Sequence, residues 1–376
     1  MSLFQVYHLL NINLTKAKDV YVYDQEGLEY LDLYGGHAVI SIGHGHPKYK
    51  DRLKSQIDAI GFYSNSVQNK IQEELGEKLV RFSNCLDYRL FLCNSGAESN
   101  ENALKLASFH TQASRVIAFK NGFHGRTSAA VAVTDNPKIN APLNTQQNVD
   151  FFELGNLVGV EKSLEKGDVC AIIFECIQGV GGLDEAPSDF YKALEQLAKK
   201  YKVLLIADEV QSGFGRTGDF FAFQKHGIQP DIISMAKGMG NGFPVGGILI
   251  APHIEAEYGM LGTTFGGNHL ACSAALCVLE VLEEEKLMEH VAEVSNYFIS
   301  EANKIPQIKK VKGRGLMLGL EFNFPIAALR EQLVYTHHIF TGNSNNKNVL
   351  RILPPLSIQK EHIDLFFSAL KIVLKQ

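Results

Sequence analysis

The chain has 376 residues, of which 45% are hydrophobic and 20% charged, so it can form a large core, and we expect it to divide into two domains. Its net charge of −5 includes no basic block or stripe, which removes the electrostatic support for binding nucleic acid or a membrane surface. The six cysteines form no C-x-x-C pair, and we expect buried, reduced thiols in a cytoplasmic protein.

The predicted elements begin with short strands and then alternate between strands and helices. The N-terminal stretch has no basic region or long apolar run, so we expect no signal peptide, and no later segment is long enough to span a membrane. Residues 19–33 alternate in hydropathy, with a turn at Glu26 and Gly27. From about Asp51 onward, apolar strands are predicted at 89–92, 115–119, 171–175, 203–207, 231–235 and 246–251.

Helices are predicted between several of these strands. Ser188 is expected to cap one of them, whose apolar face consists of Phe190, Leu194, Leu197 and Tyr201. Because fully apolar strands alternate with helices, the sequence predicts an α/β fold whose largely parallel sheet is covered on both faces.

The C-terminal third has a different pattern. A long helix is expected after the segment TTFGG, followed by a smaller α+β part whose strands lie in GRGLMLGLEF and VLRILPPLSI. We therefore expect a large domain at 51–265, a linking helix and small domain at 266–376, and an N-terminal segment at 1–50 that joins the small domain.

The segment 213–218 contains three glycines with the spacing G-x-G-x-x-G, which also occurs in dinucleotide-binding folds. In those folds the glycines lie at the tip of a strand and open a helix that faces a pyrophosphate. Here the strand ends several residues earlier, and an aromatic stretch without a helical pattern follows. This context argues against a nicotinamide-dependent dehydrogenase and directs attention to Asp208 and Gln211 at the end of the strand.

Ligands of parallel α/β sheets bind at the carboxyl ends of the strands, so the residues that follow each strand are candidates. The stretch 95–97 opens a helix and could hold a phosphate, although such a stretch by itself is more often a plain helix cap. Phe123 lies on a glycine-rich turn beside Arg126, where an exposed aromatic plate and an ordinary surface turn are both possible. Glu175 ends another strand and could be a functional carboxylate or a turn cap.

Two charged residues complete this set. Asp208 follows five apolar residues, so it should be partly buried and should need a cationic partner, either an arginine or a protonated ring nitrogen. Lys237 lies among glycines that would let a planar ligand approach closely. Pyridoxal 5'-phosphate requires four features at one edge of the sheet: backbone N–H groups that bind its phosphate, an aromatic side chain that stacks on its ring, a buried aspartate and a lysine.

The sequence resembles the class III, fold-type I aminotransferases, and in particular the acetylornithine and succinylornithine aminotransferases. The matching motifs cover most of the chain in the family's order: NSGAESNENALKLA, GFHGRT, ADEVQSGFGRTG, MAKGMGNGFPVGG, TTFGGNHLAC, GRGLMLGLEF and VLRILPPL. The resemblance implies a mostly parallel seven-stranded sheet with helices on both faces, a small α+β domain and pyridoxal 5'-phosphate as cofactor.

The resemblance also implies roles around the cofactor ring. Lys237 would form the Schiff base, and Asp208 would pair with the pyridinium nitrogen. Gln211 would bond the phenolic oxygen, while Val210 and Phe123 would sandwich the ring.

At the phosphate, the resemblance assigns backbone N–H groups of Gly96 and Ala97. Thr264 would reach the phosphate of the neighbouring subunit, which implies a homodimer. Neither nucleic acid nor a membrane is expected as a partner.

The family's substrates imply roles for three further residues. Arg126 would hold the carboxylate remote from the reacting carbon, and Arg351 would hold the α-carboxylate of 2-oxoglutarate. Glu175 would neutralise Arg351 while the ω-amine substrate is bound. The implied reaction moves the ω-amino group of N-acetyl- or N-succinylornithine to 2-oxoglutarate, giving the N-acyl glutamate semialdehyde and glutamate, in arginine biosynthesis.

Several positions depart from the usual family pattern. The common E-P-I-Q-G-E-G-G carries Cys176 and Val180 here, and the common G-G-N-P carries His269. Substrate identity therefore stays open between acylated ornithine, free ornithine and 4-aminobutyrate, and a glutamate-semialdehyde-type aminomutase or a non-catalytic regulator of the same fold is a further alternative. His44 and His46 could bind a metal, but no third ligand lies at a recognisable spacing, so no metal is expected.

Overall fold

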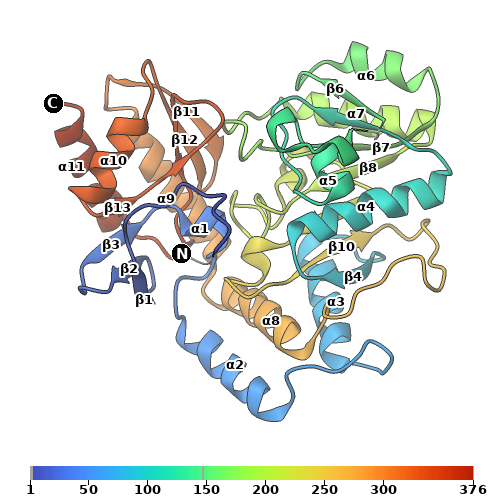
Figure 1. The fold of residues 1–376 in the computed structure, drawn as a ribbon, viewed down its shortest axis with the longest axis horizontal. Coiled ribbons are helices and arrows are strands. Elements are labelled where there is room, and N and C mark those ends of the chain that lie inside the picture. The colour runs from blue at the N-terminus through green and yellow to red at the C-terminus, as the bar shows by residue number, and fades with distance from the viewer. Residues whose placement is uncertain (1–2, 146–147, 376) are drawn as a thin grey trace.

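A seven-stranded sheet forms the centre of the larger lobe in the computed structural model, which describes residues 3–145 and 148–375 (Figure 1). Neighbouring strands are parallel except at β10, which is antiparallel to both of its neighbours. The predicted, mostly parallel α/β sheet is therefore confirmed. In spatial order its strands are β4 (Arg89–Cys93), β10 (Gly246–Ile250), β9 (Ile232–Met235), β8 (Leu204–Asp208), β7 (Val169–Phe174), β5 (Arg115–Phe119) and β6 (Val149–Phe152).

The edge strand β6 is the strand that sequence patterning misses. It is short, only partly buried, and carries Asp150 in its middle. That carboxylate pairs with Arg115 of the neighbouring strand at 2.5 Å, which compensates for a charge within the sheet. A strand of this kind lacks the continuous apolar run by which the other six are recognised.

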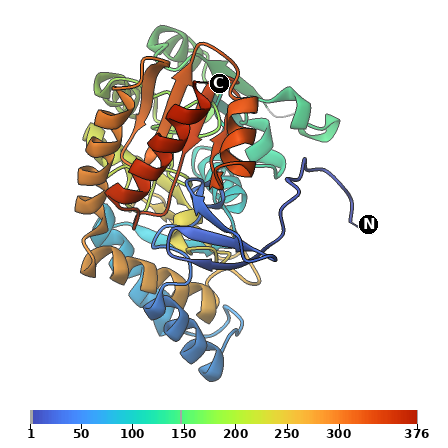
Figure 2. The ribbon, with the colours of Figure 1, turned by 90° about the vertical axis from the view of Figure 1, so that its left-hand side faces the viewer.

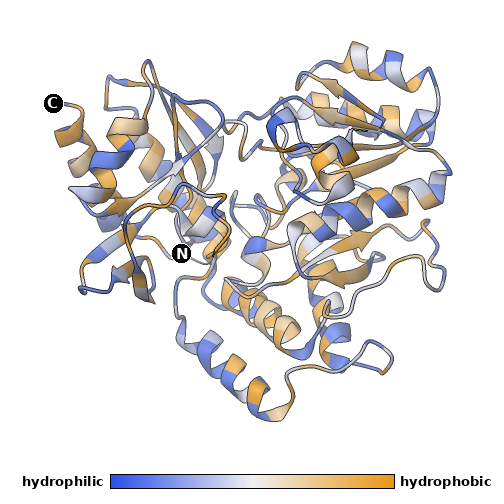
Figure 3. Ribbon diagram, in the orientation of Figure 1, coloured by the Kyte–Doolittle hydropathy of each residue, from blue (hydrophilic) through white to orange (hydrophobic). Residues whose placement is uncertain are grey.

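Helices cover both faces of this sheet, because its residues alternate between the two faces. Leu205 belongs to the core that contains buried residues of α3 (Lys70–Ser83), α6 (Leu157–Leu164), α7 (Ser188–Tyr201) and α8 (His269–Glu284). Its neighbour Ile206 belongs to the separate core beneath α4 (Gly96–Thr111). Figure 3 shows the apolar colouring of the central strands and of α8.

The helix α7 forms as its apolar pattern predicts, but the predicted cap is wrong. Pro187 occupies the N-cap position, and no side chain caps the helix there. The hydroxyl of Ser188 instead lies 3.0 Å from Nδ1 of His226. This competing buried partner explains the difference, since one hydroxyl cannot serve both sites well.

The smaller lobe combines the two ends of the chain (Figure 2). Its first sheet is β1 (Leu14–Lys18), β2 (Tyr21–Asp24), β3 (Glu29–Asp32) and β13 (Ile339–Phe340), with β13 parallel to β3. The expected pairing of the N-terminal segment with the C-terminal part is thus present, while the domain limits at 50 and 265 stay a prediction. Its second sheet is β11 (Ile308–Arg314), β12 (Met317–Phe322), β15 (Val349–Ile352) and β14 (Gly342–Asn343).

The remaining helices pack beside these sheets or connect the lobes. The expected long helix is two helices, α8 and α9, which meet where Lys286 adopts a left-handed conformation with φ +50°. The helices not yet placed are α1 (Gly35–Ala38), α2 (Pro47–Ala59), α5 (Ser128–Ala132), α9 (Leu287–Ala302), α10 (Ala327–Tyr335) and α11 (Lys360–Val373).

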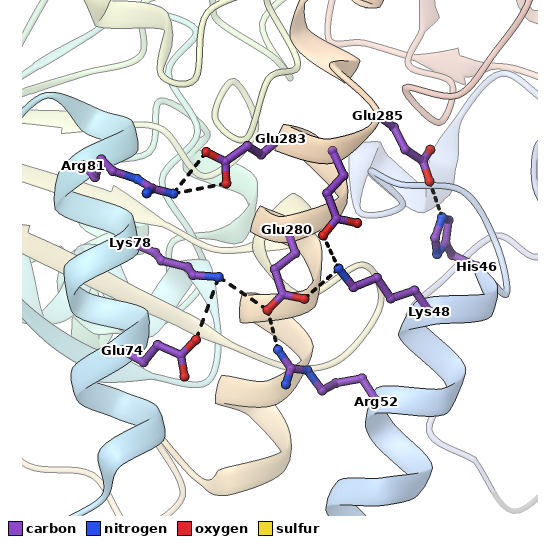
Figure 4. A network of polar contacts seen from close by, with 10 residues as sticks. His46, Lys48, Arg52, Glu74, Lys78, Arg81, Glu280, Glu283 and Glu285 are labelled. Atoms are coloured by element: carbon purple, nitrogen blue, oxygen red, sulfur yellow. Dashed lines mark hydrogen bonds and ion pairs between the residues drawn. The ribbon is translucent and has the colours of Figure 1, made fainter.

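Ion pairs attach α8 to α2 and α3 (Figure 4). The carboxylate of Glu280 lies 2.5 Å from Arg52, 2.9 Å from Lys48 and 3.4 Å from Lys78. Burial raises the pKa of Glu280, but the hydrogen bond to Lys48 and the charges of the three cations outweigh it, so the pKa is lowered. The network therefore stabilises the fold at neutral pH and loses this contribution as the pH falls through the lowered pKa.

All six cysteines are buried and free, as expected from their apolar surroundings. Within the described ranges, no helix is long and apolar enough to cross a membrane.

Candidate active site

A cavity of about 370 Å³ lies at the carboxyl ends of β7, β8 and β9, where a parallel sheet places its ligands. Nine of the residues singled out from the sequence line it, although they come from five separate stretches of the chain. They are Gly96, Ala97, Phe123, Arg126, Glu175, Asp208, Val210, Gln211 and Lys237. Two others, Thr264 and Arg351, do not line the cavity.

The carboxylate of Asp208 is buried at the end of β8 and accepts three hydrogen bonds. Oδ2 accepts one from Asn100 and one from His124, both at 2.7 Å, and Oδ1 accepts one from the backbone N–H of Val210 at 3.0 Å. Burial would lower the pKa of His124, but the hydrogen bond and charge of Asp208 raise it. Together, Asn100 and His124 hold the carboxylate of Asp208 in one orientation beside the cavity.

Asn100 and His124 are site residues that the motif analysis leaves without a role. Asn100 also donates to the backbone oxygen of His124 at 2.7 Å and accepts from Ser234 at 2.6 Å, so its amide is fully engaged. Asn100 lies one helical turn after Gly96 and therefore near the same end of α4, but no local sequence pattern singles it out.

The start of α4 has the backbone geometry of an anion-binding site, and the binding of a phosphate there stays a prediction. Ser95 caps the helix by accepting from the N–H of Glu98 at 3.2 Å, and the first N–H groups of a helix have no partner within it. A Cβ atom on Gly96 would lie 2.5 Å from Cγ1 of Val210. A glycine is thus required where the helix end meets the loop after β8, and the backbone stays accessible to a phosphate.

Lys237 lies directly after β9, in a short helical turn where its φ is +46°. Burial lowers the pKa of its ammonium group to about 8, a shift that Arg351 increases and that Asp208 and Glu175 oppose. A substantial fraction of this amine is therefore neutral near pH 8, as a nucleophilic lysine requires.

Gln211 presents an unsatisfied polar group. Its Oε1 is buried and has no hydrogen-bond partner among the described residues, while Nε2 donates weakly to the backbone oxygen of His37 at 3.4 Å. A buried amide oxygen without a hydrogen-bond partner destabilises the fold, so we expect the Gln211 side chain to bond an atom of a ligand.

Glu175 and Arg351 are close but do not form a direct ion pair in the described chain. The Glu175 oxygens accept from the N–H groups of Phe123 at 2.9 Å and Gly179 at 3.0 Å. Arg351 is 3% exposed, and its guanidinium donates to the backbone oxygens of Asn343 at 2.5 Å and Gly179 at 2.9 Å. The backbone of Gly179 therefore contacts both the carboxylate and the guanidinium that the family resemblance implies to neutralise each other.

Replacing Gly179 with alanine should disrupt this arrangement. A Cβ there would lie 1.9 Å from Oε1 of Gln211 and 3.1 Å from Cε of Met317. We expect the free energy of unfolding to fall by about 1–3 kcal/mol, measured by chemical denaturation. Gly76→Ala is the control, since its Cβ would lie 3.8 Å from Leu90 within a helix, where alanine stabilises. Equal stability of Gly179→Ala and the native protein would contradict the packing argument.

Arg126 and Thr264 differ from the buried residues of the site. Arg126 is exposed at the mouth of the cavity, and its guanidinium has no hydrogen-bond or ion-pair partner within the described residues. Thr264 is exposed and lies outside the cavity of its own chain.

The glycine-spaced loop 213–218 has a packing role. Gly215 and Gly218 have φ of +81° and +93°, and the loop continues into a short turn of 3₁₀ helix at 222–226. Arg216 is buried, and its guanidinium donates to the backbone oxygens of Ile40, Leu316 and Pro354. The glycines let the loop fold around this contact between the lobes, and they form no dinucleotide site.

The two histidines considered for metal binding have separate partners. His44 lies 2.8 Å from Asp32, and His46 lies 2.8 Å from Glu285. Among the described residues, no group of three or more His, Cys, Asp or Glu side chains could hold a metal ion.

Comparison with known families agrees with this geometry. The model of the family "Aminotransferase class-III" matches residues 4–374. The chain belongs to this family. It is 41% identical to the acetylornithine aminotransferase of Aquifex aeolicus, with 98% of both chains covered, and 38% identical to the succinylornithine transaminase of Photorhabdus laumondii, with 93% and 90% covered.

Solved structures of the family are also similar. The acetylornithine aminotransferase of Elizabethkingia anophelis is 30% identical, with a TM-score of 0.86 and 99% and 96% of the chains covered. The ornithine aminotransferase of Toxoplasma gondii is 27% identical, with a TM-score of 0.92 and 100% and 93% covered. Both the fold-type I architecture and the aminotransferase class are therefore established for this chain, and the dehydrogenase alternative is excluded.

The cavity fits pyridoxal phosphate, the cofactor of class-III aminotransferases. Three features match parts of that molecule. The buried amide oxygen of Gln211 has no partner among the described residues and could bond a polar group of the ring, and the helix start at Gly96 leaves its backbone N–H groups accessible to the phosphate. The amine of Lys237, a fraction of which is neutral near pH 8, could bond the aldehyde. The buried carboxylate of Asp208 has the charge to match a protonated ring nitrogen.

Proposed function

We propose that this aminotransferase moves the ω-amino group of an N-acylornithine to 2-oxoglutarate, giving the N-acyl glutamate semialdehyde and glutamate. The observation that carries the proposal is near-complete similarity to enzymes of that name: relatives named acetylornithine aminotransferase are 36–41% identical over 96–98% of this chain. A succinylornithine transaminase at 38% identity favours the succinyl derivative as the second candidate.

Several cavity residues have proposed tasks around the cofactor. When bound, pyridoxal phosphate supplies a protonated ring that withdraws electrons from the reacting carbon. Asp208 keeps the ring nitrogen protonated, Lys237 bonds the cofactor covalently and then moves the proton at the reacting carbon, and Gln211 bonds the phenolic oxygen. Phe123 and Val210 enclose the ring, and the N–H groups at the start of α4 bind the phosphate.

Two arginines are proposed to bind the substrate carboxylates, and of the two Arg126 lines the cavity. Arg126, exposed at the mouth and without a partner in the described chain, is proposed to bind the carboxylate remote from the reacting carbon. Arg351 is proposed to bind the α-carboxylate of 2-oxoglutarate or glutamate. Glu175, whose oxygens accept the N–H groups of Phe123 and Gly179, is proposed to neutralise Arg351 while the ω-amine substrate is bound.

A panel of amine donors with 2-oxoglutarate tests the proposed function. N-acetylornithine, N-succinylornithine, ornithine and 4-aminobutyrate are compared by kcat/KM for glutamate formation. We expect an acylated ornithine to lead by at least about tenfold. A lead for ornithine or 4-aminobutyrate would overturn the substrate assignment, and isomerisation of an amino aldehyde without 2-oxoglutarate would indicate an aminomutase.

The lowered pKa of Lys237 predicts the pH dependence of cofactor capture. Protein stripped of cofactor should bind pyridoxal phosphate through the neutral amine, which exists above a pKa of about 8. The capture rate constant is then expected to rise about tenfold between pH 7 and pH 9 and to level off. Stopped-flow absorbance measures it, and a rise that continues past pH 10, as for an exposed lysine, would contradict the buried environment.

We further propose that the chain is a homodimer whose interface includes an apolar surface beside Thr264. Phe265 is 60% exposed, and its ring lies 5.4 Å from that of Phe62, which is 44% exposed. Tyr63 and Val67 are exposed next to them, and exposed apolar clusters of this kind mark protein interfaces. Thr264 would then reach the phosphate in the neighbouring subunit.

Replacing Phe265 with glutamate should therefore dissociate the dimer and weaken cofactor binding. Sedimentation velocity gives the subunit state, and cofactor titration gives the affinity. Ile372→Glu is the matched control, because this residue is 51% exposed on α11, in the other lobe. A variant that remains dimeric would contradict the proposed interface. A monomeric variant that keeps full cofactor affinity would contradict the proposed role of Thr264.

A further inference from the structure

Three stretches of the chain meet at the side chain of Asn100, which is 1% exposed and lines the cavity. Its amide nitrogen donates to Oδ2 of Asp208 at the end of β8 and to the backbone oxygen of His124 in the loop after β5, both at 2.7 Å. Its amide oxygen accepts from the hydroxyl of Ser234 on β9 at 2.6 Å. Asn100 therefore joins the ends of three strands from which the site is built.

The amide of Asn100 fits these partners in one direction only. The two groups that its nitrogen contacts, the Asp208 carboxylate and the His124 carbonyl, both accept hydrogen bonds. A side-chain amide has nearly the same shape when its oxygen and nitrogen are exchanged, but the oxygen would then face two other oxygens. Both buried acceptors would lose this donor, which is unfavourable away from water.

Ser234 selects this direction of the amide. It is fully buried and does not line the cavity, and within the described residues its hydroxyl has no other acceptor than the Asn100 oxygen. The strand register pairs Ser234 with Asp208, and the backbone oxygen of Ser234 accepts from the N–H of Glu209 at 2.9 Å. The end of β8 that carries the carboxylate thus also holds the serine that orients the amide.

The carboxylate of Asp208 keeps one oxygen available. Oδ2 accepts from both Asn100 and His124, while Oδ1 accepts one bond, from the backbone N–H of Val210 at 3.0 Å. Because a carboxylate oxygen can accept about two hydrogen bonds, Oδ1 has capacity for a donor in the cavity that Asp208 lines. Without the bond from Asn100, Oδ2 would compete for that donor and the carboxylate could turn.

We propose that Ser234 is a positioning residue that acts through Asn100 to keep Oδ1 of Asp208 available to the protonated ring nitrogen of the cofactor. The inference rests on the proposed pairing of Asp208 with that nitrogen. Ser234 orients the amide of Asn100, and the amide holds Oδ2, so that Oδ1 remains for the cofactor. Ser234 has this effect without lining the cavity.

The test uses a cofactor analogue that has C–H in place of the ring nitrogen but keeps the aldehyde, the phosphate and the phenolic hydroxyl. The full chain, stripped of cofactor, is titrated with pyridoxal phosphate and with this analogue, and the ratio of the two Kd values measures the preference for the ring nitrogen. Asn100→Ala should lower this preference about tenfold and Ser234→Ala about threefold, since each weakens the hydrogen bonding of a charged group. The affinity for the analogue should not fall, because the analogue has no ring N–H to donate to Asp208.

A double variant shows whether Ser234 acts through Asn100. If it does, Ser234→Ala combined with Asn100→Ala should show the same preference as Asn100→Ala alone. Ser295→Ala is the matched control, because it removes another buried serine hydroxyl, which donates to a backbone oxygen within α9. It should leave the preference unchanged.

Equal weakening of both ligands by Ser234→Ala and Asn100→Ala would indicate a purely structural role and overturn the proposal. A double variant whose loss is the product of the two single losses would also overturn it. Should Asn100→Ala not fold, Ser234→Ala still decides, since it retains the asparagine.

Asp208→Ala separates a failure of this inference from a failure of the proposed function. If Asp208→Ala leaves the preference unchanged, the carboxylate does not pair with the ring nitrogen, and the proposed function of Asp208 fails with the inference. If Asp208→Ala abolishes the preference while Ser234→Ala has no effect, the inference alone is wrong.

Discussion

Lys237→Ala is expected to lower turnover by about 10⁴-fold or more, the largest effect of any single change in this chain. The substitution removes both the amine that bonds the cofactor and the group that moves the proton at the reacting carbon. No other lysine lines the cavity within the described chain, so none can take over. The measurement is steady-state glutamate formation with the best donor of the panel.

Two controls make this result specific. Lys225→Ala removes an exposed lysine from the 3₁₀ turn after the glycine loop and should leave turnover unchanged within about twofold. Thermal unfolding of Lys237→Ala should show a folded protein. Turnover within tenfold of the native enzyme would remove Lys237 from the mechanism.

Asp208→Asn is expected to slow the chemical step by about 10²–10³-fold, as the removal of a single preorganised electrostatic group does in other enzymes. An amide carries no charge to keep the ring nitrogen of the cofactor protonated. Because Asn100, His124 and the start of α4 remain, cofactor binding should persist. Single-turnover absorbance separates the slowed step from binding.

The matched control is Asp189→Asn, which changes an exposed carboxylate in the first turn of α7. It should leave the single-turnover rate unchanged. A near-native rate for Asp208→Asn would show that the buried charge is not needed, and complete loss of cofactor would show that its task is binding.

The ends of the apolar strands could be predicted because the apolar run of each strand and the residues that flank it indicate the same boundary. Asp208 and Lys237 follow such strands, and the topology of a parallel sheet then brings them to one edge. Contacts between distant segments could not be predicted in this way. The bond from Asn100 to Asp208 joins residues 108 positions apart, and no local pattern distinguishes this asparagine from Asn102.

The surroundings of Arg351 depend even more on tertiary packing. The motif VLRILPPL identifies the arginine, but its partners come from Asn343, Gly179 and Tyr34, in three different stretches of the chain. The resemblance assigned Glu175 to neutralise Arg351 while the ω-amine substrate is bound, and this role stays a prediction. In the described structure the two carboxylate oxygens of Glu175 accept the N–H groups of Phe123 and Gly179, contacts that no sequence pattern indicates.

Mapping the cofactor attachment site is the most direct test of the account. The cofactor-loaded protein is reduced with borohydride, digested and analysed by mass spectrometry, which fixes the cofactor on the lysine that bears it. Assembly of Asp208, Gln211 and the start of α4 around one amine predicts a single modified peptide, with the added mass on Lys237. The same mass on any other lysine, or no modified peptide from a protein shown to contain cofactor, would contradict the proposed site.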